Sequence, residues 1–377
     1  MNYVLNLTAA CDPVCRDGML SHNREHLTFE TVKLILEKEA RSSGVCGITF
    51  TGGEPLLQWP LIRETVRYGT RLMQRGRTRF DFRISTDGLL LRDDMIDFAQ
   101  RYDVTIALCL GSWNGVLDRN SATPDGSVPC GTDEKRKQTI GKILKTMPYS
   151  PVYLTADSSS SSELADAVET LYQNGFRDIC IETSQNGRWT AEQLAGLHRQ
   201  YQRIARFYFE RTLHGDAFYL SPFEEKMQSY ALGGRTCLER CELGKNCITV
   251  TADGAFYPCN QLTGQPQYQI GSIRTGIDDM RRYALYRSNG TEKKECAACA
   301  YHSRCKNSCA CKNFAATGTI TEVSPVLCAQ EKALIPVTDD LAKRLLRNNY
   351  AAFLQKPYDR IHGYQPERER AVRNVLV

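Results

Sequence analysis

The chain has 377 residues, of which 42% are hydrophobic and 24% are charged, and its formal net charge is +5. These values exclude a disordered or fibrous chain and allow one large α/β domain plus a smaller one. The basic residues are scattered, which argues against a nucleic-acid or membrane partner. No apolar run approaches the roughly 18 residues of a membrane span, and no basic segment precedes the first apolar run. We therefore expect a cytoplasmic protein without a signal peptide.

The first half of the chain alternates strand-like and helix-like segments. The predicted strands are rich in β-branched residues and lie at 3–8, 45–51, 80–86, 104–110, 151–155 and 178–183. Apolar residues recur at helical spacing in the segments between them, as in "TFETVKLILEKEAR" behind Thr28. This order predicts a parallel sheet, either doubly wound or a partial barrel of six βα units, and periodicity alone does not choose between them.

The second half changes character. A helical pattern, "TAEQLAGLHRQYQRIARFYFERTL", is followed by a turn-rich, cysteine-dense region in which Asp253-Gly254 predicts a hairpin turn. A polar, basic segment that looks helical at its start closes the chain. The expected division is 1–188 (α/β core), 189–235 (helical linker), 236–335 (cysteine-rich domain) and 336–377 (C-terminal tail).

Cysteine is the unusual residue of this composition. Ten of the sixteen cysteines fall between Cys237 and Cys328, and clustered cysteines in a reducing compartment more often bind metal than form disulfides. Eight of them can complete two four-cysteine sites, which suits two [4Fe–4S] clusters or two zinc ions. These eight are Cys241, Cys247, Cys259, Cys296, Cys299, Cys305, Cys309 and Cys328.

Two motifs follow the first two predicted strands. "TAACDPVCRDGML" places Cys11 and Cys15 in a C-x3-C spacing, half of an iron–sulfur signature, but Gly18 stands where a third cysteine is expected. "TFTGGEP" ends the second strand, where βα proteins place ligand-binding loops. Its glycines let the backbone approach a ligand, and Glu54 offers a carboxylate to a cationic group such as an amine. A tight βα turn without a ligand is the alternative for this motif.

Together, C-x3-C, GGEP and the eight-cysteine array resemble the radical S-adenosylmethionine (SAM) family with a C-terminal SPASM domain, of the peptide-maturase and anaerobic sulfatase-maturase type. The resemblance covers roughly residues 3–335. It implies an α/β fold: a partial (β/α)6 TIM-like barrel that carries SAM and its cluster, followed by a small cysteine-rich SPASM domain with two auxiliary [4Fe–4S] clusters.

The resemblance also implies roles for individual residues. The first auxiliary cluster would use Cys241, Cys247, Cys259 and Cys309, and the second would use Cys296, Cys299, Cys305 and Cys328. Cys11 and Cys15 would hold the radical-SAM cluster. The implied SAM contacts are Gly52, Gly53, Glu54 and Pro55 after the second strand, and Thr86 and Asp87 after the third.

The implied function is that of an oxidoreductase that modifies a peptide or protein by hydrogen abstraction through a 5′-deoxyadenosyl radical. Its partners would be the peptide substrate and a reductant such as a ferredoxin or flavodoxin. The implied products include crosslinks, epimers and formylglycine. The alternative is a degenerate relative that binds a peptide or relays electrons through its auxiliary clusters. A zinc-bound interaction module is a third possibility.

Two departures from the family pattern support the alternative. Gly18 replaces the third cluster cysteine, and Gly111-Ser112 stands where relatives often have Asp-Gly. The missing ligand has three explanations: a true loss, a short deletion within "CDPVC", or a substitute thiol, for which Cys46 is the early candidate. We expect Cys46 instead to be a buried core thiol. Packing or bystander roles are likewise expected for Cys109, Cys130, Cys180, Cys237 and Cys311.

Overall fold

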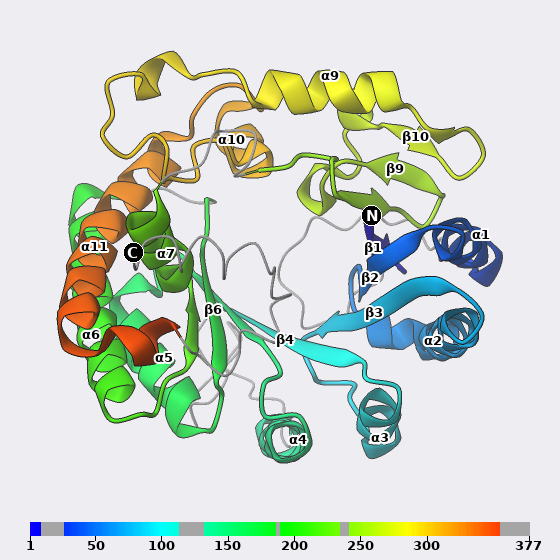
Figure 1. Ribbon diagram of the computed structural model, residues 1–377, viewed down its shortest axis with the longest axis horizontal. Helices are drawn as coiled ribbons and strands as arrows, with labels where there is room; N and C mark the ends of the chain where they lie inside the picture. Colours follow the sequence, from blue (N-terminus) through cyan, green and yellow to red (C-terminus); the bar gives the residue numbers. More distant parts are fainter. Residues whose placement is uncertain (9–25, 113–131, 186–188, 234–240, 355–377) are drawn as a thin grey trace, which may run out of the picture. The chain divides into compact units, whose positions relative to one another are not determined.

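The computed structural model describes residues 1–8, 26–112, 132–185, 189–233 and 241–354 (Figure 1). The chain forms two compact units, each assembled from separate stretches. The first unit comprises Met1–Cys109, Glu134–Ile140 and Glu242–Gly290, and the second comprises Leu110–Asp133, Gly141–Cys241 and Thr291–Val377. Each unit therefore combines residues of the α/β half with residues of the cysteine-rich half.

The first unit is built on a parallel sheet. Strands β1 (Asn2–Asn6), β2 (Ser43–Thr51), β3 (Arg77–Thr86) and β4 (Thr105–Ser112) pair in chain order. On the other side of β1, β8 (Cys247–Val250) adds a further parallel strand. It is followed by the antiparallel strands β9 (Ala255–Tyr257), β10 (Gly271–Ser272) and β11 (Gly276–Ile277). The cysteine-rich sequence thus extends the sheet, which its turn-rich composition did not predict.

Helices cover one face of this sheet. They include α1 (Phe29–Ala40), α2 (Trp59–Met73) and α3 (Asp93–Arg101), which lie along the outer side of β1–β4 in Figure 1, and α9 (Asp279–Asn289). The short 3-10 helices η1 (Pro55–Gln58), η3 (Asn260–Leu262) and η4 (Pro266–Tyr268) complete this unit, and α4 (Thr132–Thr146) contributes residues to both units.

The two faces of the sheet differ in burial. Leu5, Phe50 and Phe82 are at most 2% exposed and point toward the helices, where the Phe82 ring packs against α2 at Gly69. The residues between them, such as Thr49 and Arg83, are half-buried. The described helices of this unit cover one face of the sheet, and polar side chains are accommodated on the other.

The second unit has its own strands and longer helices. Strands β5 (Val152–Ala156), β6 (Asp178–Thr183) and β7 (Tyr219–Ser221) are parallel and pair in that order. The helices are η2 (Ser161–Glu163), α5 (Leu164–Gln173), α6 (Ala191–Leu213), α7 (Phe223–Leu232), η5 (Lys294–Cys296), α10 (Ala310–Thr317) and α11 (Pro325–Leu354). Helix α11 packs on α6 and α7, as Figure 1 shows.

All six predicted strands are present within three residues of their expected ends. The Asp253-Gly254 hairpin is confirmed: Gly254 has φ +79°, its N–H donates to the Thr251 carbonyl at 2.8 Å, and β8 and β9 pair on either side. Helix α11 runs through residues 335 and 336, where a boundary was expected; the four-part division stays a prediction. In the described segments, no helix is both long and apolar enough to cross a membrane.

Thr190 is the N-terminal cap of α6. Its Oγ1 accepts from the Gln193 N–H at 3.2 Å, and the Gln193 Oε1 accepts from the Thr190 N–H at 2.9 Å, which forms a capping box. We expect Thr190→Ala to lower the free energy of unfolding by about 1 kcal/mol, measured by denaturant titration, whereas Thr190→Ser retains most of it. Equal losses in the two variants would contradict a capping role.

Candidate functional site

The carboxyl ends of β2 and β3 meet at a buried carboxylate. Glu54, three residues beyond β2, is 2% exposed. Its carboxylate accepts from the Leu56 N–H at 2.9 Å and from the Asp87 N–H at 3.3 Å. The Thr86 hydroxyl lies 2.9 and 3.0 Å from the two carboxylate oxygens. The structure therefore brings together Glu54, Thr86 and Asp87, which the sequence placed in two separate motifs.

The glycines of GGEP join the end of β2 to the end of β1. The Gly53 N–H donates to the Thr8 carbonyl at 2.9 Å. Gly52 has φ +130°, and a Cβ atom at this position would lie 2.4 Å from the Thr8 oxygen. A side chain would therefore be both conformationally strained and in steric conflict with β1. Pro55 is buried and is the first residue of η1, and Glu54 is the N-cap of this short helix.

Burial dominates the ionisation of Glu54. Removal from water raises the pKa of Glu54 from 4.5 to about 7, and the nearby Asp87 charge adds to this effect. The hydrogen bonds from Leu56 and Thr86 act in the opposite direction but do not cancel it. A buried carboxylate of this kind is stabilised by a cation, so the site suits an ammonium group.

The segment that carries Cys11 and Cys15 is anchored at the same edge. Thr8 forms an antiparallel bridge with His26, and the Leu27 N–H donates to the Leu7 carbonyl at 3.1 Å. The His26 Nδ1 also lies 3.2 Å from the Gln58 Nε2 of η1. Both ends of this segment thus lie beside the glycine motif, while Cys11, Cys15 and Gly18 themselves lie outside the described residues.

A polar row that sequence reasoning missed lies on the sheet face away from the helices. Asn6 is in register with Thr51, and the Phe50–Ile84 pair places Thr51 next to Ser85. The Asn6 Oδ1 is buried and has no hydrogen-bond partner in the part of the chain that the structure describes. The period-two alternation of polar and apolar residues in β1–β3 was the signal that would have found this row.

A further missed residue lies at the carboxyl end of β5, in the second unit. Asp157 accepts from the backbone N–H groups of Ser159 and Ser160, each at 2.8 Å, and from both hydroxyls. Partial burial alone would raise the pKa of Asp157, but these hydrogen bonds outweigh it and lower the pKa to about 2. Sequence reasoning did not single out this carboxylate, which organises the turn that leads into η2.

Two predicted metal ligands belong to the β8–β9 hairpin of the first unit. Thr249 pairs with Tyr257, and Cys247 and Cys259 each lie two residues beyond that pair at the same end of the hairpin. Burial raises the pKa of the Cys247 thiol. The hairpin therefore carries both thiols at one end.

The remaining predicted ligands belong to the second unit. The Cys299 N–H donates to the Cys296 carbonyl at 3.0 Å, which closes the C-x2-C segment into a turn. The Cys309 and Cys311 sulfur atoms lie 3.6 Å apart at the start of α10, so Cys311, expected as a bystander, contacts a predicted ligand. Cys241 lies at the edge of the described chain, and Cys328 lies in the first turn of α11.

The cysteine array fits a cluster in its donor chemistry. None of the described cysteines forms a disulfide, and thiolates are the ligands that [4Fe–4S] clusters take. Within the described residues, however, no three Cys, His, Asp or Glu side chains are gathered as a metal site. The two sets of four ligands therefore stay predictions.

Cys46 has the environment of a core thiol. It is 1% exposed, and burial raises the pKa of its thiol to about 12. It lies six residues before Gly52, or about 20 Å from the GGEP motif along the strand. That separation disfavours Cys46 as the substitute cluster ligand. Cys180 is also buried and contacts Asp178, whereas Cys109 is half-buried and Cys130 and Cys237 lie outside the described residues.

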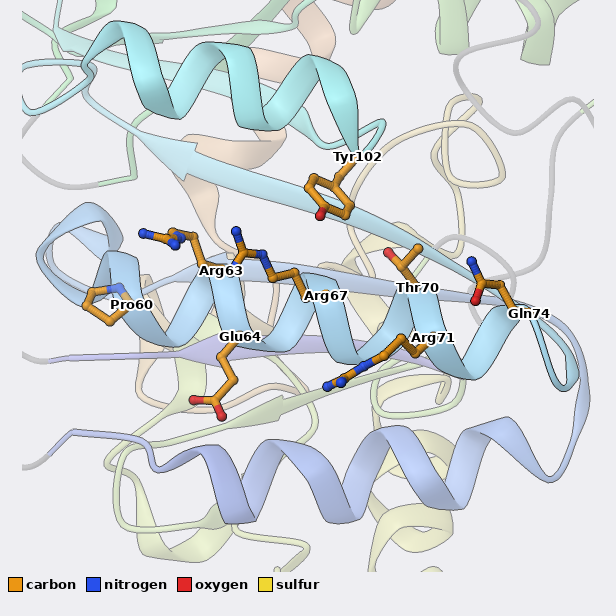
Figure 2. A pocket seen from close by; sticks show the side chains of 8 residues that line it. All are labelled: Pro60, Arg63, Glu64, Arg67, Thr70, Arg71, Gln74 and Tyr102. Atoms are coloured by element: carbon orange, nitrogen blue, oxygen red, sulfur yellow. The ribbon is translucent and has the colours of Figure 1, made fainter.

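Two hollows in the described surface lie away from these strand ends. One of about 740 Å³ runs along α2 and is lined by Arg63, Arg67, Arg71 and Tyr102, among others (Figure 2). Another, of about 460 Å³, lies between α6 and α11. Neither includes a predicted site residue. We place the candidate site at the strand ends because the buried acid, the close glycine contact and the anchored cysteine segment coincide there.

No protein-family model and no curated protein sequence matches this chain. Solved structures do match it. The chain is similar to anSMEcpe, an anaerobic sulfatase-maturating enzyme with bound AdoMet, with a TM-score of 0.71 and 15% identity over 94% of this chain and 98% of that one. The same enzyme with AdoMet and the Kp18Cys peptide matches with a TM-score of 0.70 and 14% identity over 92% and 99%.

The chain is also similar to Streptococcus suis SuiB bound to S-adenosylmethionine, with a TM-score of 0.58 and 15% identity over 87% of this chain and 74% of that one. The class defined by the fold is an α/β protein with a large parallel sheet. More specifically, the chain shares the fold of these solved structures, a partial TIM-like barrel, as the resemblance implied.

Proposed function

We propose that this protein is a radical SAM enzyme of the SPASM type that modifies a peptide or protein. The observation that carries the proposal is the buried Glu54 carboxylate, held by Thr86 and Asp87 at the strand edge where the Cys11–Cys15 segment is anchored. The fold shared with AdoMet-bound maturases supports it.

In this proposal, SAM occupies the site formed by Gly52, Gly53, Glu54, Pro55, Thr86 and Asp87. The Glu54 carboxylate accepts hydrogen bonds from the methionyl ammonium, which compensates for its burial. Thr86 orients the carboxylate by donating its hydroxyl hydrogen to it. The absence of a side chain at Gly52 keeps the ends of β1 and β2 in contact beneath the ligand.

The cysteines would hold [4Fe–4S] clusters in the sets predicted above, with Cys11 and Cys15 at the radical centre. These two cysteines and the Glu54 site would hold the cluster and SAM, which together would supply the chemistry of hydrogen-atom abstraction from the substrate through a 5′-deoxyadenosyl radical. A low-potential reductant such as a ferredoxin or flavodoxin would supply the electron. A peptide substrate is supported by the peptide-bound complexes of the similar enzymes.

A second function is favoured by two glycines. Gly18 replaces the third cysteine of the radical centre, and Gly111 stands near the end of β4, with φ +63°, where relatives often have Asp. With both changes, the protein would bind a peptide or relay electrons for an intact enzyme without cleaving SAM.

Anaerobic reconstitution with iron and sulfide, followed by iron counting and mass-spectrometric assay of 5′-deoxyadenosine, tests the two functions. About twelve irons per chain with reductant-dependent 5′-deoxyadenosine formation is the result expected of the enzyme. About eight irons without 5′-deoxyadenosine would overturn the enzyme and support the partner. Zinc without iron would overturn both. A Cys11→Ser/Cys15→Ser variant is the matched control, since it should lose only the radical-centre iron.

A further inference from the structure

The second unit contains a buried ion pair that sequence reasoning did not single out. Lys226 of α7 and Glu331 of α11 have side chains that are 4% and 8% exposed, and the Lys226 Nζ lies 2.5 Å from the Glu331 Oε2. Burial lowers the pKa of Lys226, whereas the Glu331 charge opposes that shift. Such a pair is costly to desolvate, and apolar residues of similar volume are often at least as stabilising. The ion pair is therefore better explained by the other groups that Lys226 and Glu331 bind than by a gain in stability.

Both members of the pair bind the backbone around one cysteine. The Lys226 Nζ donates to the Arg304 carbonyl at 2.8 Å, and the Glu331 Oε2 accepts from the Lys306 N–H at 3.0 Å. Cys305 is the residue between these two groups, and its own N–H donates to the Tyr301 carbonyl at 2.9 Å. The peptide groups before and after Cys305 are thus fixed by a single ion pair that joins α7 to α11.

A second ion pair supports the same segment from its side chain. The Arg304 guanidinium contacts the Asp339 carboxylate of α11 at 2.5 and 2.9 Å and donates to the Lys226 carbonyl at 3.1 Å. Its Nε also donates to the Ser229 hydroxyl of α7 at 3.2 Å. Two helices thus hold the backbone on both sides of Cys305 through charged groups, in addition to the hydrogen bond from its own N–H to Tyr301 within the loop.

We propose that Lys226 and Glu331 are positioning residues that hold the backbone of Cys305 so that its thiolate can bind a metal centre. The proposal rests on the proposed function, which makes Cys305 a ligand of an auxiliary cluster. It assigns to this ion pair the role of pre-organising a ligand in a segment with little regular structure, together with the hydrogen bond from the Cys305 N–H to Tyr301.

The test is the double substitution K226M/E331L, which replaces the pair with apolar side chains of similar volume and leaves no unpaired charge. We expect its thermal unfolding midpoint to stay close to that of the unaltered protein. After anaerobic reconstitution it should lose about four irons per chain, together with the corresponding absorbance of an iron–sulfur cluster. The single variant K226M, which leaves a buried lone carboxylate, should in contrast be less stable.

The matched control removes an ion pair of the same unit that binds no cysteine segment. Arg203 and Asp166 contact at 2.7 Å on the surface of α6 and α5, and their side chains are 45% and 60% exposed. R203Q/D166N should leave both the unfolding midpoint and the iron content unchanged. A K226M/E331L protein that is folded and retains the iron of the unaltered protein would overturn the positioning role.

Alkylation of Cys305 separates failure of this inference from failure of the proposed function. In the metal-free protein, peptide mass spectrometry after timed iodoacetamide treatment should show Cys305 reacting about fivefold faster or more in K226M/E331L, because two backbone hydrogen bonds are lost. If the unaltered protein binds no iron, the proposed function fails, but the alkylation contrast still decides whether the pair holds Cys305. Equal alkylation rates would overturn the inference whatever the iron content.

Discussion

Gly52→Ala is expected to destabilise the first unit by about 2–5 kcal/mol and to abolish SAM binding. Two costs combine. An alanine at φ +130° is strained by about 1–2 kcal/mol, and its Cβ would meet the Thr8 carbonyl at 2.4 Å, which forces β1 and β2 apart at a further cost of about 1–3 kcal/mol. Denaturant unfolding measures the first effect, and equilibrium binding of SAM measures the second.

Gly44→Ala is the matched control for this substitution. Gly44 lies in the same strand with φ +111°, but a Cβ there would have no atom within 4 Å. It therefore carries the backbone strain without the steric conflict and lies at the opposite end of β2. We expect a smaller loss of stability and unchanged SAM binding. Equal effects of the two substitutions would contradict a specific role for the Gly52–Thr8 contact.

Glu54→Gln is expected to weaken SAM binding by about 10- to 100-fold, the value of a charge-assisted hydrogen bond in a buried site. Because the pKa of Glu54 is raised to about 7, the unaltered protein should bind SAM more tightly as the pH rises from 6 to 8 and the carboxylate ionises. This increase in SAM affinity between pH 6 and 8 should be absent in the glutamine variant. Calorimetric titrations at pH 6, 7 and 8 measure both effects, and parallel pH profiles for the two proteins would contradict the assignment.

The same ionisation makes a prediction for stability that is independent of SAM. Folded Glu54 keeps its proton up to about pH 7, whereas the unfolded carboxyl loses it near 4.5. The unfolded state therefore binds fewer protons between these values, and the stability of the protein falls by about 3 kcal/mol as the pH rises through this window. Glu54→Gln lacks this loss. The difference in free energy of unfolding between the variant and the unaltered protein should therefore favour the variant more at pH 8 than at pH 4.5. The variant would then fold well while binding SAM poorly.

The sequence predicted the parallel strands and the two halves of the site because both have local signals. β-branched runs bounded by polar residues mark the strands, and parallel strands bring their carboxyl ends to one edge, which is how Glu54 of GGEP meets Thr86 and Asp87. What it missed is non-local. The position of β8 beside β1 depends on pairing across more than 240 residues, and the contacts of Lys226 with Arg304 and Glu331 join three distant segments.

Two features of the described structure were not predicted from the patterns. One is the polar row of Asn6, Thr51 and Ser85, which alternate with apolar residues along their strands. The other concerns Cys311, which was expected to be a bystander because it falls between assigned ligands; its sulfur lies 3.6 Å from that of Cys309, and its role stays a prediction. The spacing of cysteines along the sequence predicts which of them bind metal. It does not show that Cys311, two residues after Cys309 at the start of the same helix, brings its sulfur next to that of Cys309.

The central claim is that SAM binds at the carboxyl ends of β1–β3. A crystal structure of the anaerobically reconstituted protein grown with SAM tests it most directly. The account predicts electron density for SAM with its methionyl amine within hydrogen-bonding distance of the Glu54 carboxylate, next to Gly52, Gly53 and Thr86. SAM bound elsewhere, such as in the arginine-lined hollow along α2, with the Glu54 carboxylate still contacting only Leu56, Thr86 and Asp87, would contradict it.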